Sequence, residues 1–301
     1  MRAIFQWKTG SRVLELGRRT LIMGIVNVTP DSFSDGGQHI DAAKAVAHAE
    51  LLLDEGATII DVGGESTRPG ARTAAAQTAN SSANPVSEEE ERRRVLPVIR
   101  DLKKRRPQSV ISVDTYKAGV ARAAVDEGAE IVNDISGFRW DPKMAKALAE
   151  LKVGAILMHT RGRPEEWRTL PPIGDPVLLV KRELRQLAEA ATLAGIKRDH
   201  LVLDPGFGFG KSFEENYPLL AHFGELQLLG FPLLAGVSRK SFLGRMLARD
   251  GKDAPVEERT HGTLAAEAIL VLKGAHILRT HDVRLAAEAS RVADAVVASG
   301  G

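Results

Sequence analysis

The sequence predicts a (β/α)8 barrel, in which eight parallel strands are each followed by a helical segment. Eight short apolar runs are spaced along the 301 residues, and Ala- and Leu-rich segments of helical period lie between most of them. The expected strands are Leu21–Val28, Thr58–Gly64, Ser109–Thr115, Ile131–Ser136, Gly154–Thr160, Leu201–Gly206, Pro232–Val237 and His276–Asp282. The expected helices include Asp41–Glu55, Lys117–Glu127, Asp141–Leu151 and Pro176–Ala194. Each run ends in a polar or Gly-rich cluster, and in such barrels the carboxyl ends of the strands converge on one mouth that holds the active site.

A β-hairpin is expected ahead of the first barrel strand. Residues Ala3–Leu16 alternate weakly in polarity around Lys8-Thr9-Gly10-Ser11, which suits a turn. We expect the hairpin to cap the amino-terminal end of the barrel. Length alone would allow two domains, but barrels of this class often exceed about 250 residues. We therefore predict one domain over residues 1–301.

Composition excludes several classes of function. The 41 basic residues nearly balance the 39 acidic ones, so no general nucleic-acid partner is expected. The chain has no cysteine, which excludes disulfides, cysteine-ligated metals and thiol catalysis. No run approaches the roughly 20 apolar residues of a membrane span, and Met1–Gly10 does not resemble a signal peptide. A soluble, cytoplasmic protein is expected.

Two stretches interrupt the strand–helix rhythm. Residues Ala71–Asn84 are small and polar, without large apolar side chains that could join a core, and we interpret them as a mobile loop over the barrel mouth. A helix should begin after this loop, because Ser87 and Glu90 have the spacing of a capping box. The second stretch, Arg161–Asp175, is rich in Pro, Gly and charge.

Basic residues at two strand ends predict an anionic substrate. Ser238-Arg239-Lys240 follows the seventh expected strand and opens a predicted helix, Ser241–Ala248. Arg279 and His281 lie two residues apart on the eighth strand and therefore on one face of it. Barrels often bind phosphate at these two loops, with Arg as a planar fork and Lys as a point charge. The alternative is ordinary surface basicity.

Carboxylates and an amide end three other strands and favour a flat heterocycle. They are Asp114, Asn133 with Asp134, and Asp204. Acceptors beside an Asn suit a ring that carries several N–H donors. Asp134 fits a helix cap equally well. Phe207 and Phe209 would wall an aromatic ligand or belong to the core.

The first strand ends in groups that suit a metal and a movable loop. Asn27 closes the strand, and Asp31 and Asp35 follow in the loop Thr29–Gly37. A neutral oxygen with carboxylates near a phosphate suits Mg²⁺, which binds few protein ligands and keeps several waters. The spacing alone is a weak metal signal.

Seven blocks of the sequence resemble the dihydropteroate synthase family, in family order and over nearly the whole chain. The blocks include M-G-I-V-N-V-T-P-D-S-F-S-D-G-G and D-P-G-F-G-F-G-K. In full they are Met23–Gly37, Asp61–Gly70, Ser112–Thr115, Ile131–Gly137, Asp204–Lys211, Gly236–Gly244 and Arg279–Asp282. The stretch Ala71–Asn84 is longer than the family usually has there.

The resemblance implies that 6-hydroxymethyl-7,8-dihydropterin diphosphate condenses with 4-aminobenzoate, giving 7,8-dihydropteroate and pyrophosphate. By matched position, the pterin would be held by Asp114, Asn133, Asp204, Lys240 and Phe209. The diphosphate would be held by Asn27, Arg279 and His281, with Mg²⁺ on Asn27. The aminobenzoate would be framed by Phe33, Ser66, Thr67, Arg68, Pro69, Phe209, Lys240 and Ser241. The residues implied in catalysis are Asn27, Asp35, Lys240, Arg279 and His281, of which Asp35 would help to close the first loop.

The chemistry of this reaction agrees with the residues. An electron-rich dihydropterin stabilises positive charge at its methylene, so the diphosphate can leave first, in an SN1-like step. The protein would then mainly neutralise the departing pyrophosphate, with Mg²⁺ as cofactor. A neutral arylamine is already nucleophilic and needs no strong base.

Two rival functions and two further properties complete the expectations. The rivals are a pterin-binding methyltransferase domain, which would lack the S-R-K and R-x-H residues, and a pterin-binding paralogue without synthase activity. The family resemblance also suggests a homodimer through barrel helices, to which the apolar Leu264–Lys273 would contribute unless it faces the core. Sulfonamides, which resemble 4-aminobenzoate, should inhibit.

Overall fold

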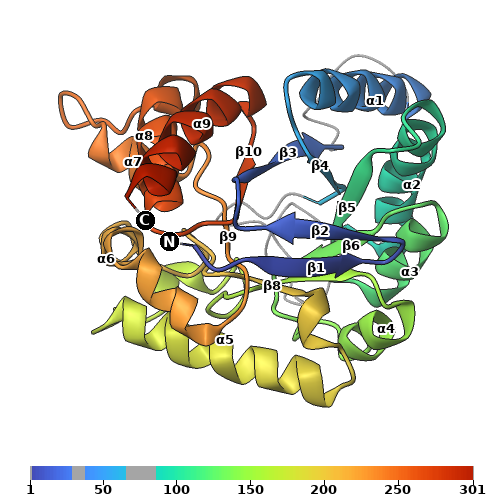
Figure 1. Ribbon diagram of the computed structural model, residues 1–301, viewed down its shortest axis with the longest axis horizontal. Helices are drawn as coiled ribbons and strands as arrows, with labels where there is room; N and C mark the ends of the chain where they lie inside the picture. The colour runs from blue at the N-terminus through green and yellow to red at the C-terminus, as the bar shows by residue number, and fades with distance from the viewer. Residues whose placement is uncertain (1, 29–37, 66–85, 301) are drawn as a thin grey trace.

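Eight parallel strands form the centre of the computed structural model, which describes residues 2–28, 38–65 and 86–300 (Figure 1). The strands are β3 (Leu21–Asn27), β4 (Ile59–Gly63), β5 (Val110–Asp114), β6 (Ile131–Asp134), β7 (Gly154–Met158), β8 (Leu201–Asp204), β9 (Leu234–Ala235) and β10 (Ile277–Thr280). Their order in the sheet is β8-β7-β6-β5-β4-β3-β10-β9. A parallel bridge from Leu203 to Leu233 joins the two end strands. The predicted (β/α)8 barrel is confirmed, with each strand shorter than its apolar run.

Helices surround the barrel (Figure 1). They are α1 (Gln38–Asp54), α2 (Glu88–Arg105), α3 (Ala118–Asp126), α4 (Met144–Leu151), α5 (Pro176–Leu193), α6 (Asn216–Ala221), α7 (Ser241–Met246), α8 (Thr260–Leu272) and α9 (Val283–Ser299). The four helices expected from helical period are confirmed within a few residues at their ends. The helix predicted over Ser241–Ala248 ends earlier, at Met246.

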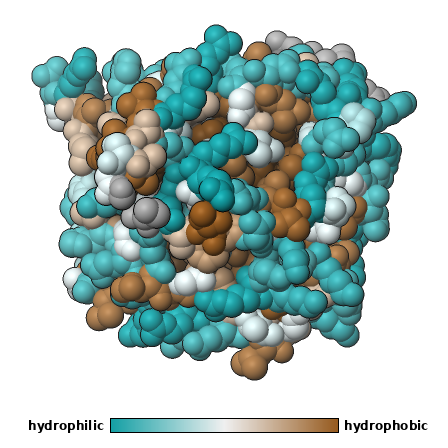
Figure 2. Space-filling view, viewed as in Figure 1, coloured by the Kyte–Doolittle hydropathy of each residue, from teal (hydrophilic) through white to brown (hydrophobic). Residues whose placement is uncertain are grey.

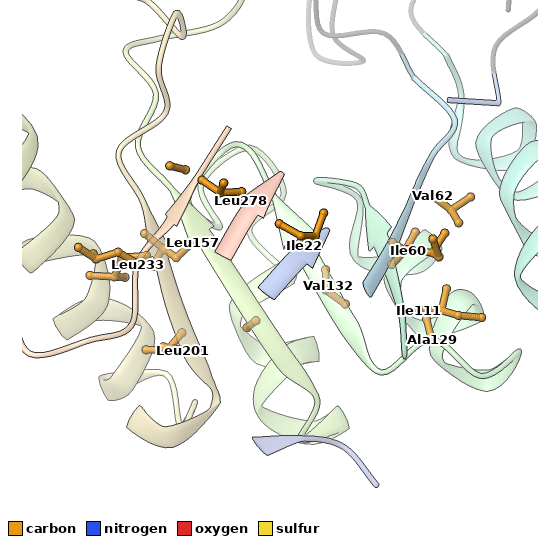
Figure 3. Close-up of a cluster of buried hydrophobic side chains, with 14 of the residues drawn as sticks. Ile22, Ile60, Val62, Ile111, Ala129, Val132, Leu157, Leu201, Leu233 and Leu278 are labelled. Atoms are coloured by element: carbon orange, nitrogen blue, oxygen red, sulfur yellow. The ribbon is translucent and has the colours of Figure 1, made fainter. Parts of the chain in front are cut away.

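The alternation of strand side chains produces two separate cores. In β4, Ile60 and Val62 point outward and pack in the large cluster between sheet and helices, part of which is drawn in Figure 3. Ile59 points inward and packs with residues from the amino-terminal ends of the other strands. Because inward and outward positions alternate, Asp61 faces the barrel interior with Ile59.

The hairpin closes the amino-terminal end of the barrel, as predicted. It consists of β1 (Phe5–Thr9) and β2 (Arg12–Leu16), paired antiparallel. Trp7 and Leu16 pack against the inward-facing layer that contains Ile59. The indole of Trp7 also donates to the carbonyl of His200 at 2.8 Å, which satisfies its buried N–H. Water is thereby excluded from that end, and the interior opens toward the strand carboxyl ends.

Polar contacts hold the described residues on either side of residues 66–85. Ser87 caps α2 by accepting from the backbone N–H of Glu90 at 3.1 Å, so this half of the predicted capping box is confirmed. Just before the second gap, Glu65 pairs with the buried amine of Lys117, which also pairs with Glu91 of α2. The predicted loops Thr29–Gly37 and Ala71–Asn84 both lie outside the described residues.

The face of the molecule in Figure 2 is mostly hydrophilic, with smaller hydrophobic areas between charged side chains. Within the described parts of the chain, none of the helices combines the length and apolar character needed to cross a membrane.

Candidate active site

A buried polar network joins β4, β5, β6 and β10 inside the barrel. The guanidinium of Arg279 donates from Nε to Asp61 Oδ2 and from Nη2 to Asp114 Oδ2, both at 2.7 Å. The side-chain amide of Asn133 donates to the same Asp61 oxygen at 3.0 Å. Asp61 is fully buried, whereas Asp114 and Arg279 remain partly open to the barrel mouth. Arg279 is therefore fixed by two carboxylates.

The charged groups in this network shift one another's pKa values. Burial alone would lower the pKa of Arg279, but the carboxylates of Asp61 and Asp114 outweigh it and raise that pKa above its usual value. Burial raises the pKa of Asp114 to about 7; the charge of Arg279 opposes this rise and that of Asp61 adds to it. The guanidinium therefore remains charged between the carboxyl groups of Asp61 and Asp114.

Asp204 lies at the end of β8 with one oxygen occupied and one available. Its Oδ1 accepts from the backbone N–H of Gly206 at 2.7 Å, and no donor among the described residues reaches Oδ2. Burial raises its pKa to about 6, against the opposing charges of Lys240 and Arg279. At pH 7 the carboxylate is mostly ionised and presents a free acceptor.

Lys240 faces the mouth from the loop after β9. Its ammonium lies 4.0 Å from the centre of the Phe209 ring, a cation–π contact. The pKa of Lys240 is lowered to about 8, chiefly by burial and then by the charge of Arg279, while the charge of Asp204 opposes the shift. Lys240 and Phe209 thus form one wall of the site, and Ser241 follows as the first residue of α7.

The loop between Asp204 and Lys211 is held from inside by Lys211. Its buried amine donates to the carbonyls of Gly206 at 2.8 Å and Phe209 at 3.2 Å, and the carbonyl of His159 lies at 3.4 Å. Burial lowers the pKa of Lys211 to about 7. Gly206 has a φ of +64°, and a Cβ there would lie 2.0 Å from the His159 carbonyl oxygen. Only glycine fits this approach.

An apolar patch lines the mouth beside this loop. Phe209 packs with Ile135 and Met158, and Trp167 meets the Phe209 ring edge-on at 5.3 Å. Phe207, in contrast, is fully buried and packs against the aromatic rings of the outer core. Of the two alternatives for these rings, Phe209 lies at the site and Phe207 belongs to the core.

Of the remaining described residues of the predicted site, two lie at strand ends and two lie outside the mouth. Asn27, at the end of β3, is exposed, and His281 is half-buried directly after β10. The basic side chain of Arg239 does not belong to the mouth, because it forms a two-point ion pair with Asp282. Asp134 is also outside it: its carboxylate accepts from the backbone N–H of Ser136 at 2.6 Å and caps the turn after β6.

The structure thus brings together Asp114, Asn133, Asp204, Phe209, Lys240 and Arg279 around one mouth. Predicted residues outside the described part of the chain are Asp31, Phe33, Asp35, Ser66, Thr67, Arg68 and Pro69. The sequence alone indicates no role for Asp61 or Lys211, although they lie in the family-like blocks Asp61–Gly70 and Asp204–Lys211. A charged residue at an inward position of an otherwise apolar strand is the signal that identifies Asp61.

The residues present are suited to Mg²⁺ only together with a ligand. No cluster of three or more His, Asp or Glu side chains that could hold a metal occurs in residues 2–28, 38–65 and 86–300. Asn27 offers one neutral oxygen at an exposed strand end. Magnesium typically takes one or two protein ligands and completes its shell with phosphate oxygens and water, so Asn27 fits if a diphosphate binds beside it.

Acceptors and an amide for a flat, N–H-rich ring, next to cations for an anionic group, define a barrel enzyme that binds a pterin-like ligand. The family described as "Pterin binding enzyme" matches residues 23–281. A dihydropteroate synthase of Clostridium beijerinckii is 42% identical, with 96% of this chain and 99% of that protein covered. One from Escherichia coli K12 is 44% identical, with 92% of each covered.

Solved structures agree. Xanthomonas albilineans dihydropteroate synthase with 4-aminobenzoic acid superposes with a TM-score of 0.86 at 43% identity, covering 98% of this chain and 99% of that one. The same enzyme in complex with 7,8-dihydropteroate gives 0.82 at 41% identity, covering 97% and 99%. The chain belongs to the dihydropteroate synthase family and is a transferase.

We expect Asp204→Asn to weaken binding of pterin diphosphate by about 2–4 kcal/mol. The amide keeps the shape but can turn its N–H₂ toward N–H donors of the ligand. Isothermal titration calorimetry measures the loss. Asp199→Asn, in the short helical turn Arg198–His200 just before the same strand, is the matched control and should bind as the parent does. Equal affinity of Asp204→Asn and the parent would refute the role of Asp204.

Proposed function

We propose that the enzyme joins 6-hydroxymethyl-7,8-dihydropterin diphosphate to 4-aminobenzoate and releases pyrophosphate. The observation that carries this proposal is the meeting of the carboxyl groups of Asp114 and Asp204 with Arg279 and Lys240 at one barrel mouth. We also propose that residues 1–301 form one pterin-binding domain. A cytoplasmic location remains a prediction from the sequence.

The pterin is proposed to lie edge-on against the barrel floor. The free oxygen of Asp204 and the carboxylate of Asp114 accept from ring N–H groups, and Asn133 is held in place by its bond to Asp61. Phe209 and Met158 supply an apolar wall for the flat ring. This pattern of a few fixed polar groups and an apolar surface is typical of small-molecule sites.

The diphosphate is proposed to lie toward Asn27, Arg279 and His281. As the bond from the methylene carbon to oxygen lengthens, negative charge grows on pyrophosphate, and Arg279 is already fixed to meet it. Asn27 would hold Mg²⁺ together with the diphosphate, and the ion would supply further neutralisation of the phosphate charge when bound. The arylamine nitrogen then attacks the methylene cation and loses a proton to water.

The aminobenzoate is proposed to enter beside Lys240, Ser241 and Phe209. Lys240 offers a cation to its carboxylate. The partner groups Phe33, Ser66, Thr67, Arg68 and Pro69, and the closing role of Asp35, stay predictions because these residues lie outside the described ranges. We propose that sulfonamides compete for this position, since a sulfonamide complex is known for the Yersinia pestis enzyme, 40% identical to this chain.

We expect pyrophosphate release to require both substrates and to fall to near zero when EDTA removes Mg²⁺. Arg279→Ala should lower kcat about a hundredfold, as loss of a preorganised charge donor does. Coupled detection of pyrophosphate measures both. The control is Arg284→Ala, which removes an exposed arginine of the neighbouring helix and should leave kcat unchanged.

Two results would contradict this function. Full activity in EDTA would overturn the electrostatic account of the leaving group. Binding of the pterin diphosphate without any pyrophosphate release would favour the alternative of a pterin-binding paralogue without synthase activity.

A homodimer is proposed through the outer face of α8 and α9, which pack side by side (Figure 1). This face exposes the apolar side chains of Ile269, Leu272, Val292 and Val296, the last two at 70% and 55%. Glu288 and Arg291 flank a shallow hollow there. Opposite charges beside apolar residues suit a self-complementary two-fold contact.

Light scattering should give a molar mass near twice the 32.5 kDa of the chain. Val292→Glu should shift the mass to that of one chain, because it places a charge in the contact. Leu193→Glu, at an apolar position of α5 that is 89% exposed, is the control and should leave the dimer intact. A parent protein with the mass of one chain would exclude the dimer.

A further inference from the structure

Two loops at the barrel mouth are joined in register beyond the last paired residues of their strands. β9 and β10 pair Leu234 with Ile277 and Ala235 with Leu278. The same offset of 43 residues joins Ser238 to His281 and Arg239 to Asp282 through their side chains. The loop that carries Lys240 and the loop that carries His281 are thus held together.

The ion pair is the fixed part of this connection. Arg239 donates from Nη2 and Nε to the two carboxylate oxygens of Asp282, at 2.6 and 3.1 Å. Its backbone adopts φ +57°, a left-handed conformation rare for a residue with a side chain. The backbone N–H of Arg239 donates to Thr263 and its carbonyl accepts from Arg259, which hold the residue in that conformation.

The hydrogen bonds of Ser238 determine where its hydroxyl proton goes. Its Oγ accepts from the backbone N–H of His281 at 3.2 Å and lies 2.9 Å from His281 Nδ1. Ser238 is buried, and within the described part of the chain its Oγ has no hydrogen-bond partner besides the Nδ1 and the backbone N–H of His281. The hydroxyl therefore donates to Nδ1, because otherwise its proton would be buried without an acceptor.

The imidazole of His281 is neutral at pH 7. Its pKa is lowered to about 3, chiefly by burial and then by the positive charges of Arg279 and Arg239. Asp282 opposes this shift, and Lys240 adds a smaller contribution to it. A neutral imidazole carries one proton on one nitrogen. With Nδ1 accepting from Ser238, that proton is on Nε2.

We propose that Ser238 is a positioning residue that fixes His281 as the Nε2–H tautomer, so that this ring donates a hydrogen bond toward the departing pyrophosphate. This step rests on the proposed function, in which His281 lies beside the diphosphate. With the opposite tautomer, Nε2 would present a lone pair to an anion and repel it. Ser238 thereby acts through His281 without touching the substrate.

The tautomer can be measured directly by ¹⁵N NMR on protein labelled at its eight histidines. The His281→Gln variant identifies the resonances of His281. We expect Nδ1 of the parent at the shift of an unprotonated ring nitrogen and Nε2 at that of a protonated one. In Ser238→Ala the two shifts should move toward each other as the tautomers mix.

Activity provides the second readout. Ser238→Ala should lower kcat about tenfold with an unchanged KM for aminobenzoate, less than the effect of removing a donor outright. Ser290→Ala is the matched control: its hydroxyl is buried in α9 without a partner in the described structure, and neither the tautomer nor kcat should change.

A proton on Nδ1 in the parent, or an unaltered tautomer in Ser238→Ala, would overturn the assignment of Ser238. Unchanged kcat in both Ser238→Ala and His281→Gln would instead overturn the proposed role of His281 at the diphosphate. Because the spectra are recorded without substrate, the two failures are distinguishable.

Discussion

The contact of Arg279 with Asp61 and Asp114 is the interaction on which the arrangement of the barrel mouth depends. Removing a carboxylate from water costs several kcal/mol unless a charged partner and further hydrogen bonds replace the solvent. Arg279 supplies that partner to both carboxylates, and Asn133 supplies a further bond to Asp61. One guanidinium thereby holds the side chains of two other strands, and Asn133 joins a third strand to them through Asp61. The same guanidinium keeps its charge, which is what a departing pyrophosphate requires.

The rest of the fold protects this network. The hairpin packs Trp7 and Leu16 into the amino-terminal end of the barrel, which closes that end to solvent. In this setting of low dielectric constant, charges interact more strongly than they would in water. Lys211 applies the same principle to the loop after β8, where its amine binds backbone carbonyls in place of water. Protein groups alone therefore hold this loop and the Arg279 network in place within the described part of the site.

The sequence predicted the barrel, the hairpin and the strand ends that carry the site, because apolar period and strand-end position are local properties. It left Asp61 without a role, since the side chain lies two residues before the end of β4 rather than at its end. It grouped Arg239 with the cations of the mouth, but the left-handed backbone at that residue turns the side chain to Asp282. Such a conformation depends on contacts with Thr263 and Arg259, far along the chain.

The two phenylalanines after Asp204 show the same limit. Strand-like alternation would place Phe207 and Phe209 on one face, yet one is in the core and the other at the mouth. Gly206 lies before the two rings and Gly208 between them, and both have positive φ, which breaks the alternation. A run of glycines predicts a turn but not the direction in which each neighbouring side chain leaves it.

A double-mutant cycle on kcat/KM with Asp61→Asn and Arg279→Ala tests most directly whether Asp61 acts by holding Arg279. Residues in one hydrogen-bonded network couple by about 0.5–3 kcal/mol, whereas independent residues add within about 0.5 kcal/mol. If Asp61 acts by holding Arg279, the loss of transition-state stabilisation in the double variant should be smaller than the sum of the two single losses by at least about 1 kcal/mol. Circular dichroism should show that all four proteins are folded. Losses that add within about 0.5 kcal/mol would contradict it.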